Sequence, residues 1–79
     1  MTTNTQFGRQ WAPEVPRGQI EWLVARLHVS TPDRTIEANM RRRCRKLAAT
    51  PEVIQEIVDF AILAHAANRD LFAHVMGGR

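Results

Sequence analysis

The stretch from Pro51 to Met76 constrains the fold most, because it carries most of the large apolar residues of the chain. Any core has to form against it, since the burial of apolar surface is the dominant favourable term in folding. Its apolar side chains recur with the period of an α-helix. The centre of the apolar arc is formed by Ile54, Ile57, Val58, Ala61, Ala64, Phe72, Val75 and Met76. We therefore expect a long helix over residues 51–76.

Such a helix needs something to cover its apolar arc. Unbroken, it extends about 39 Å, whereas the helix expected over residues 19–29 is roughly half as long. Either the chain breaks near Asn68, which would cap a short fourth helix, or the exposed part packs on a second copy. The arc is wider than one narrow-striped helix can bury, which favours a homodimer through the C-terminal helix.

A basic helix is expected just before it, over residues 32–48. In the Thr-Pro-Asp segment 31–33, Thr31 caps free amide groups, Pro32 fits the first helical position, and the acid favours the positive end of the helix dipole. The Thr-Pro-Glu segment 50–52 repeats this start signal, so the two helices are joined by a short link and are neighbours. The apolar stripe of the basic helix is narrow and consists of Ile36, Met40, Cys44 and Leu47.

The first helix is expected over residues 19–29. Its apolar residues, spaced i, i+3, i+4 and i+7, are Ile20, Leu23, Val24 and Leu27. Together the patterns predict an all-α fold, a small bundle of three helices, or four with a break, in residues 19–79. The first two helices resemble a helix-turn-helix in which the second carries the reading surface.

Charge is distributed unevenly behind a net value of +3. From Arg34 to Lys46, six cations and one acid, Glu37, give +5. From Pro51 to Met76, one cation and four acids give −3. Adjacent like charges weaken a helix unless a counter-charge arrives, so the basic helix is expected to meet an anionic partner.

Nucleic acid is the natural partner for such a helix, with DNA favoured over RNA. Guanidinium groups neutralise phosphates and bind guanine edges, and an asparagine side chain can contact an adenine edge. On a helical wheel the cations form two rows. The first row is Arg34, Arg41 and Arg45, and the second is Arg42 and Lys46, with Asn39 beside it. Contacts dominated by phosphates and a modest sequence preference are expected.

The same charges have a plainer interpretation. They can form a solvated face, or pair with the acidic face of the long helix in the same or a neighbouring chain. Arg43 follows Ile36 by seven residues and so points along the apolar stripe, where we expect it to snorkel or to pair with an acid of the long helix.

The first 18 residues are expected to form an extended tail, because they contain two prolines and no helical period. Within the tail, Phe7, Arg9 and Trp11 are of the residue types enriched at protein-binding hot spots, and Trp22 lies off the apolar stripe of its helix. These four residues form a candidate protein-binding set. The alternative is that Trp11 folds back over one end of the helices.

Other chemistry finds little support. His65 and His74 point to opposite sides of their helix, so no metal site is expected; His65 is expected to pair with Asn68 in the core or at an interface. No phosphate loop, catalytic carboxylate pair or activated nucleophile can be assembled, so we expect no enzyme, cofactor or small-molecule substrate. The basic helix lacks the bulky apolar face of a membrane anchor. The single cysteine, Cys44, and the lack of an apolar leader fit the cytoplasm.

Three functions remain open. The first is a small dimeric nucleic-acid-binding regulatory or accessory protein, with Arg9 or Arg17 adding contacts from the tail. The second is a protein-binding inhibitor or adaptor that docks through the aromatic residues and sets the basic helix against an acidic protein surface. The third is a small structural subunit of a larger assembly.

Overall fold

The fold is organised on one long helix, α3 (Pro51–Gly77), on which two shorter helices pack. These are α1 (Arg17–Ala25) and α2 (Asp33–Cys44). The computed structural model describes residues 15–45 and 50–77, and contains no strand within them. The expected small all-α bundle is therefore confirmed.

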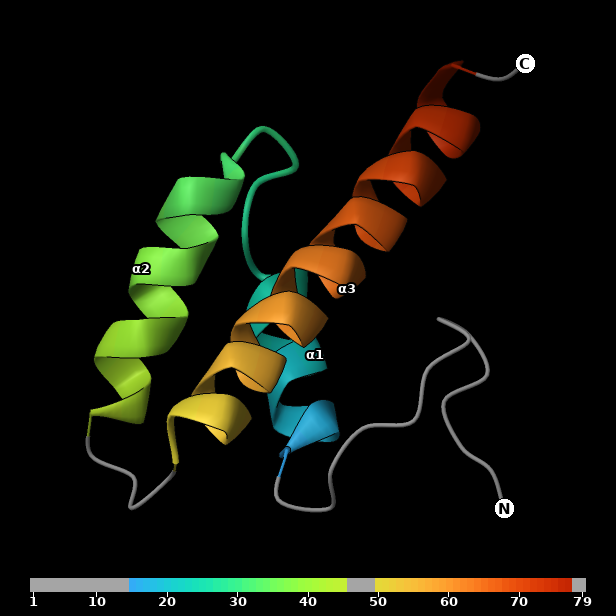
Figure 1. Cartoon of the computed structure of the whole chain (residues 1–79). Coiled ribbons are helices and arrows are strands. Elements are labelled where there is room, and N and C mark those ends of the chain that lie inside the picture. Colours follow the sequence, from blue (N-terminus) through green and yellow to red (C-terminus); the bar gives the residue numbers. More distant parts are fainter. Residues whose placement is uncertain (1–14, 46–49, 78–79) are drawn as a thin grey trace, which may run out of the picture.

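Each short helix contacts the N-terminal part of α3 (Figure 1). The end of α2 lies close to the beginning of α3, and the two helices are antiparallel. The short link between them predicts neighbours, either antiparallel or at a sharp angle, and the structure has the first arrangement. The buried apolar residues are Val15, Ile20 and Val24 from the N-terminal segment, Ile36, Met40 and Cys44 from α2, and Ile57, Val58, Phe60, Ala61 and Ala64 from α3. The core thus contains period-derived positions from each of the three predicted helices. Others stay outside it: Leu23, Leu27 and Ile54 are half-buried, and Phe72, Val75 and Met76 are exposed.

Helix α1 begins and ends earlier than the expected range of 19–29. It starts at Arg17, and Val15 before it is already buried. At its end, the amide of Arg26 bonds to the carbonyl of Leu23 at 3.2 Å and that of Leu27 to Val24 at 3.0 Å. This last turn is tightened to i→i+3 bonds, which brings half-buried Leu27 back against the core and ends the α-helix.

Helix α2 also begins differently from the expectation. Pro32 has extended dihedrals, φ −73° and ψ 154°, and occupies the N-cap, so Asp33 is the first helical residue. No side chain caps this helix end, so the expected cap by Thr31 is wrong. The predicted end at residue 48 lies outside the described residues.

Helix α3 begins as predicted and then continues further. The amide of Val53 donates to Oγ1 of Thr50 at 3.2 Å, which makes Thr50 the N-cap. The helix passes through Asn68 without a break, so the fourth helix considered as an alternative does not form in the described part of the chain. An internal asparagine costs little in a helix that is held by packing.

The connection between α1 and α2, residues 26–32, is tied to α3 by a buried histidine. His65 is 1% exposed, and its Nε2 donates to the carbonyl oxygen of His28 at 2.9 Å. The expected partner of His65 was Asn68, whereas the contact is with the loop. The same carbonyl accepts the Thr31 amide at 3.0 Å. Two donors converging on one carbonyl fix the path of the loop over α3.

The C-terminal end of α3 has no cover from α1 or α2. Residues 69–77 are exposed throughout, and we call them the overhang. Figure 1 shows this end projecting beyond both short helices. Four large apolar side chains on it remain 49–68% exposed, namely Leu71, Phe72, Val75 and Met76, which we call the apolar patch. Within the described residues, none of the helices has the length and apolar character needed to cross a bilayer.

Candidate nucleic-acid interface

The buried stripe of α2 sets the direction of its arginines. Ile36, Met40 and Cys44 face the core, each four residues apart, so the remaining positions point sideways or outward. Arg34 lies in the first turn of α2, and three further arginines lie in its last turn. The latter stabilise the negative end of the helix dipole, which is one structural reason for cations at this end.

Arg41 is held by two side chains. Its Nε donates to Oε2 of Glu37 at 2.9 Å, an ion pair one turn apart on α2. Its Nη2 donates to Oε1 of Gln55 on α3 at 2.7 Å, and Gln55 in turn donates to Oδ1 of Asp59 at 2.9 Å. Arg41 therefore joins α2 to α3, and its charge is partly balanced by nearby carboxylates. This lowers its value as a phosphate contact.

The other predicted cations that can be located are Arg34, Arg42 and Arg45. All three are exposed, and none forms an ion pair with another residue in the described ranges. We call these three residues the basic face of α2, although Arg45 is the C-cap residue that directly follows the helix. Lys46 lies outside the described residues.

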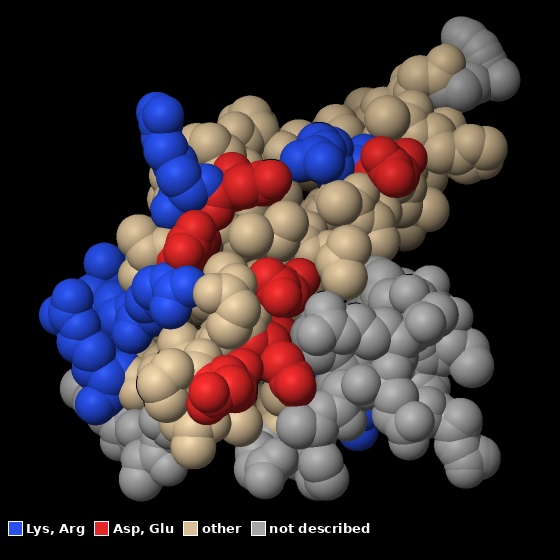
Figure 2. All heavy atoms as spheres, in the orientation of Figure 1, with Lys and Arg blue, Asp and Glu red and all other residues tan. Residues whose placement is uncertain are grey.

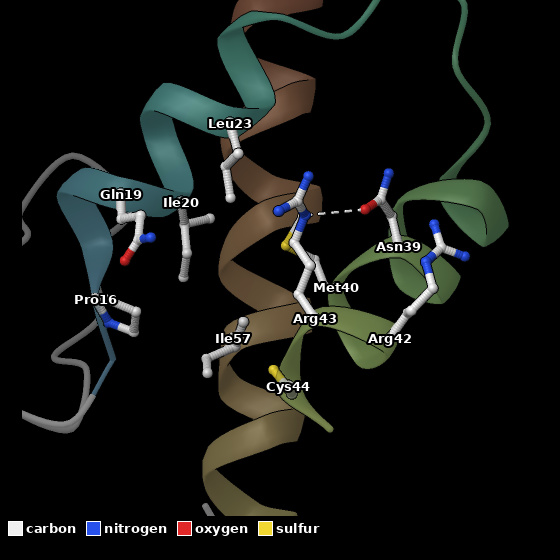
Figure 3. A pocket seen from close by; sticks show the side chains of 10 residues that line it. All are labelled: Pro16, Gln19, Ile20, Leu23, Asn39, Met40, Arg42, Arg43, Cys44 and Ile57. Atoms are coloured by element: carbon white, nitrogen blue, oxygen red, sulfur yellow. Dashed lines mark hydrogen bonds between the residues drawn. The ribbon is translucent and has the colours of Figure 1, made fainter. Parts of the chain in front are cut away.

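Asn39 and Arg43 lie on the opposite flank of α2, beside α1. Nε of Arg43 donates to Oδ1 of Asn39 at 3.2 Å, so the side-chain oxygen of Asn39 is already engaged and is not free to accept from a base. Of the two expectations for Arg43, snorkelling or pairing with an acid of α3, the pairing is replaced by this bond to an asparagine. Figure 3 shows the guanidinium group of Arg43 between Leu23 and Asn39, whereas Arg42 points away.

A cavity of about 640 Å³ opens between the three helices at this flank. Its lining is apolar toward α3 and polar toward α2 (Figure 3). The lining residues are Pro16, Gln19, Ile20 and Leu23 from the N-terminal segment, Asn39, Met40, Arg42, Arg43 and Cys44 from α2, and Ile57 from α3. Among the described residues, no acidic side chain lines it.

Cations and carboxylates are unevenly distributed over the surface. In Figure 2 the cations gather on the side of α2, at the left of the view, and carboxylates cross the middle of the same face. The first half of α3 contributes Glu52, Glu56 and Asp59, and no cation. The charge asymmetry of the sequence is therefore visible on the folded surface, although some carboxylates lie directly against cations, as in the pair of Glu37 and Arg41.

The candidate protein-binding set is located only in part. Trp22 is 60% exposed, and the guanidinium carbon of Arg26 lies 4.7 Å from the centre of its ring. Such a cation–π contact orders both side chains at the surface. Phe7, Arg9 and Trp11 lie outside the described residues.

No group of three potential metal ligands occurs within the described ranges. His65 is buried, whereas His74 is exposed on the overhang. Cys44 is a buried free thiol. Its burial raises the pKa of the thiol above the ordinary value, and the charge of nearby Arg41 acts in the opposite direction. A protonated buried thiol is a poor nucleophile, so Cys44 acts as an apolar core residue.

Two residues that position surface side chains were not predicted from the sequence. Gln55 and Arg26 both hold the surface side chains described above, Gln55 by bonding Arg41 and Arg26 by stacking on Trp22. The i, i+4 spacing of Trp22 and Arg26 was a usable signal. The pairing of Gln55 with Arg41 was not, because it depends on the packing of α2 on α3.

Comparisons of the chain with protein-family models, with curated proteins and with solved structures found no match.

Proposed function

We propose that this chain is a small non-enzymatic, cytoplasmic accessory or regulatory protein that binds nucleic acid, DNA in preference to RNA, through α2, and that it works as a homodimer through α3. The observation that supports binding is the basic face of α2. Arg34, Arg42 and Arg45 are exposed and have no carboxylate partner among the described residues, whereas the acids are concentrated elsewhere.

The proposed binding is mainly electrostatic. Three unneutralised guanidinium groups, two on α2 and one on its C-cap residue, displace the counterions condensed on a phosphate backbone, and each contributes to affinity without reading sequence. Arg41 acts in a different way, because its bonds to Glu37 and Gln55 hold α2 against α3. Asn39 is bonded by Arg43, so we assign it no base contact. Because these contacts are mainly to phosphates, we expect only a modest preference for nucleotide sequence.

Titration of labelled duplex DNA, single-stranded DNA and RNA at several salt concentrations tests the proposal. If three phosphates are contacted, the slope of log K against log salt is about −3 on duplex DNA. Arg42→Glu should reduce both the affinity and this slope, because it removes one contact and adds a repulsive charge. Arg26→Glu is the matched control, since it makes the same charge change at an exposed site, the C-cap residue that follows α1.

Equal weakening by the two substitutions would mean that only net charge matters, and would contradict a defined basic face. Absence of binding at low salt would contradict nucleic-acid binding altogether. Circular dichroism of each variant separates these outcomes from unfolding.

A second function is supported by the ordered pair of Trp22 and Arg26. Tryptophan and arginine dominate protein-binding hot spots, and this tryptophan is 60% exposed. A protein-binding inhibitor, adaptor or structural subunit would use this pair, with the tail residues Phe7, Arg9 and Trp11, against an acidic protein surface. In that case Trp22→Ala should abolish binding to the acidic partner while leaving any DNA affinity unchanged.

A further inference from the structure

The apolar patch of the overhang continues the buried face of α3. Leu71 and Phe72 follow Ala64 and His65, which are both buried, by seven residues, so they lie on the same side of the helix two turns later. Val75 and Met76 extend this side by another turn. The face that holds α1 and α2 therefore runs on past them, where neither of these helices covers it.

The patch is large for a chain of this size. With exposed fractions of 49–68%, its four side chains present on the order of 500 Å² of surface, near the upper end of what monomers normally expose in one patch. Two such patches in contact bury about 1,000 Å², which reaches the lower limit of a specific interface. A second copy of the same chain is therefore a sufficient partner.

We propose that two copies join through their overhangs as antiparallel helices related by a two-fold axis. A parallel arrangement in register is sterically excluded. There, the first half of the second α3 would run along the face of α3 that α1 and α2 already cover. In the antiparallel arrangement, each bundle lies beyond the free end of the other copy's overhang.

The pattern of the patch fixes the register. Its residues fall in two adjacent pairs separated by one turn, and the pattern reads the same in both directions. Alignment of two patches head to tail places Leu71 opposite Met76 of the second copy, and Phe72 opposite Val75. Each contact occurs twice, as a two-fold interface requires. The axis passes between Ala73 and His74, whose side chains point away from the contact.

This arrangement specifies the proposed homodimer and rests on it, but it does not depend on nucleic-acid binding. It places the two bundles, each with one basic face, at opposite ends of the molecule. The dimer would thus present two separate cationic surfaces to one polyanion, which increases apparent affinity through effective concentration.

Sedimentation equilibrium of the full chain, without nucleic acid, tests the contact. Leu71→Lys and Val75→Lys should each weaken dimerisation by at least about 100-fold, because a substitution in a two-fold interface removes two apolar contacts. Leu63→Lys is the matched control. Leu63 is 39% exposed on the opposite face of α3, and its substitution should leave the dissociation constant unchanged.

Spin labels at Glu52→Cys, in a Cys44→Ala background, test the orientation. Glu52 lies in the exposed first turn of α3. In the antiparallel register the two labelled sites are about 65 Å apart, whereas parallel helices would bring them within about 10 Å. Circular dichroism of the labelled protein verifies that the bundle is intact.

The outcomes are distinct. A monomer at all concentrations overturns both the proposed dimer and this arrangement. A dimer that survives Leu71→Lys and Val75→Lys with the affinity of the Leu63→Lys control overturns only the overhang contact. A short distance between labels overturns the antiparallel orientation. None of these results bears on whether α2 binds nucleic acid.

Discussion

His65 is the polar side chain within the buried core of the described residues, and it carries a structural role that its neighbours in sequence do not reveal. Its Nε2 bears the proton, because it donates to the carbonyl oxygen of His28. The other ring nitrogen, Nδ1, is buried and has no hydrogen-bond partner among the described residues. The side chain therefore combines the volume of a core residue with one directional bond to the α1–α2 connection.

We predict that His65→Ala lowers the free energy of unfolding by about 3 kcal/mol, as for other large-to-small changes in a core. The substitution leaves a cavity and removes the bond to the loop. Urea denaturation followed by circular dichroism measures the change. The control is His74→Ala, exposed on the same helix, for which a change within about 0.5 kcal/mol is expected. Equal losses in the two variants would contradict the role assigned to His65.

Cys44 provides a pH-dependent prediction. Because burial raises its pKa, the folded protein retains the thiol proton above pH 9.0 while the unfolded chain releases it. The contribution of this group to the free energy of unfolding is therefore constant below pH 9.0 and becomes destabilising as the pH rises further. Denaturation at pH 8 and at higher pH should show a steeper loss for the natural protein than for Cys44→Ala. Parallel losses would contradict the burial effect.

At the scale of the elements, two similar start signals have different outcomes. The Thr50 side chain accepts the amide of Val53 at the start of α3, whereas Thr31 provides no cap for α2. Thr50→Ala should therefore cost about 1 kcal/mol of stability. Thr31→Ala, the matched control, should change stability by less than about 0.5 kcal/mol. Thermal and urea unfolding measure both, and a larger loss at Thr31 would refute the assignment of the cap.

The existence of the three helices was predictable, because each carries a helical apolar period that its core residues satisfy. The residues at which the helices begin and end were less predictable. The end of α1 depends on Leu27 returning to the core through a tightened turn, and the start of α2 depends on the extended backbone of Pro32. Both are decided by tertiary packing, which overrides local signals.

The candidate site was predictable in charge but not in contacts. The exposure of Arg34, Arg42 and Arg45 follows from the narrow stripe of α2. The engagement of Arg41 by Gln55, and of Asn39 by Arg43, depends on rotamers and on how the helices pack. Spacing along one helix cannot indicate such contacts.

At the scale of the whole molecule, the different lengths of the helices determine which surface of α3 stays uncovered. Helix α3 is 27 residues long, whereas α1 and α2 have 9 and 12. Two short helices leave part of a long one uncovered, and the patch at Leu71, Phe72, Val75 and Met76 is the direct result. The proposed two-fold contact is a way to bury that surface without adding another element.

The placement of opposite charges on different helices gives the molecule a permanent electric dipole. In the field of a polyanion such a body experiences a torque, which turns the α2 side toward the polyanion ahead of the acidic first half of α3 before any contact forms. Encounters would then begin in a favourable orientation, and added salt would slow them by screening the field over a Debye length of about 10 Å at 0.1 M.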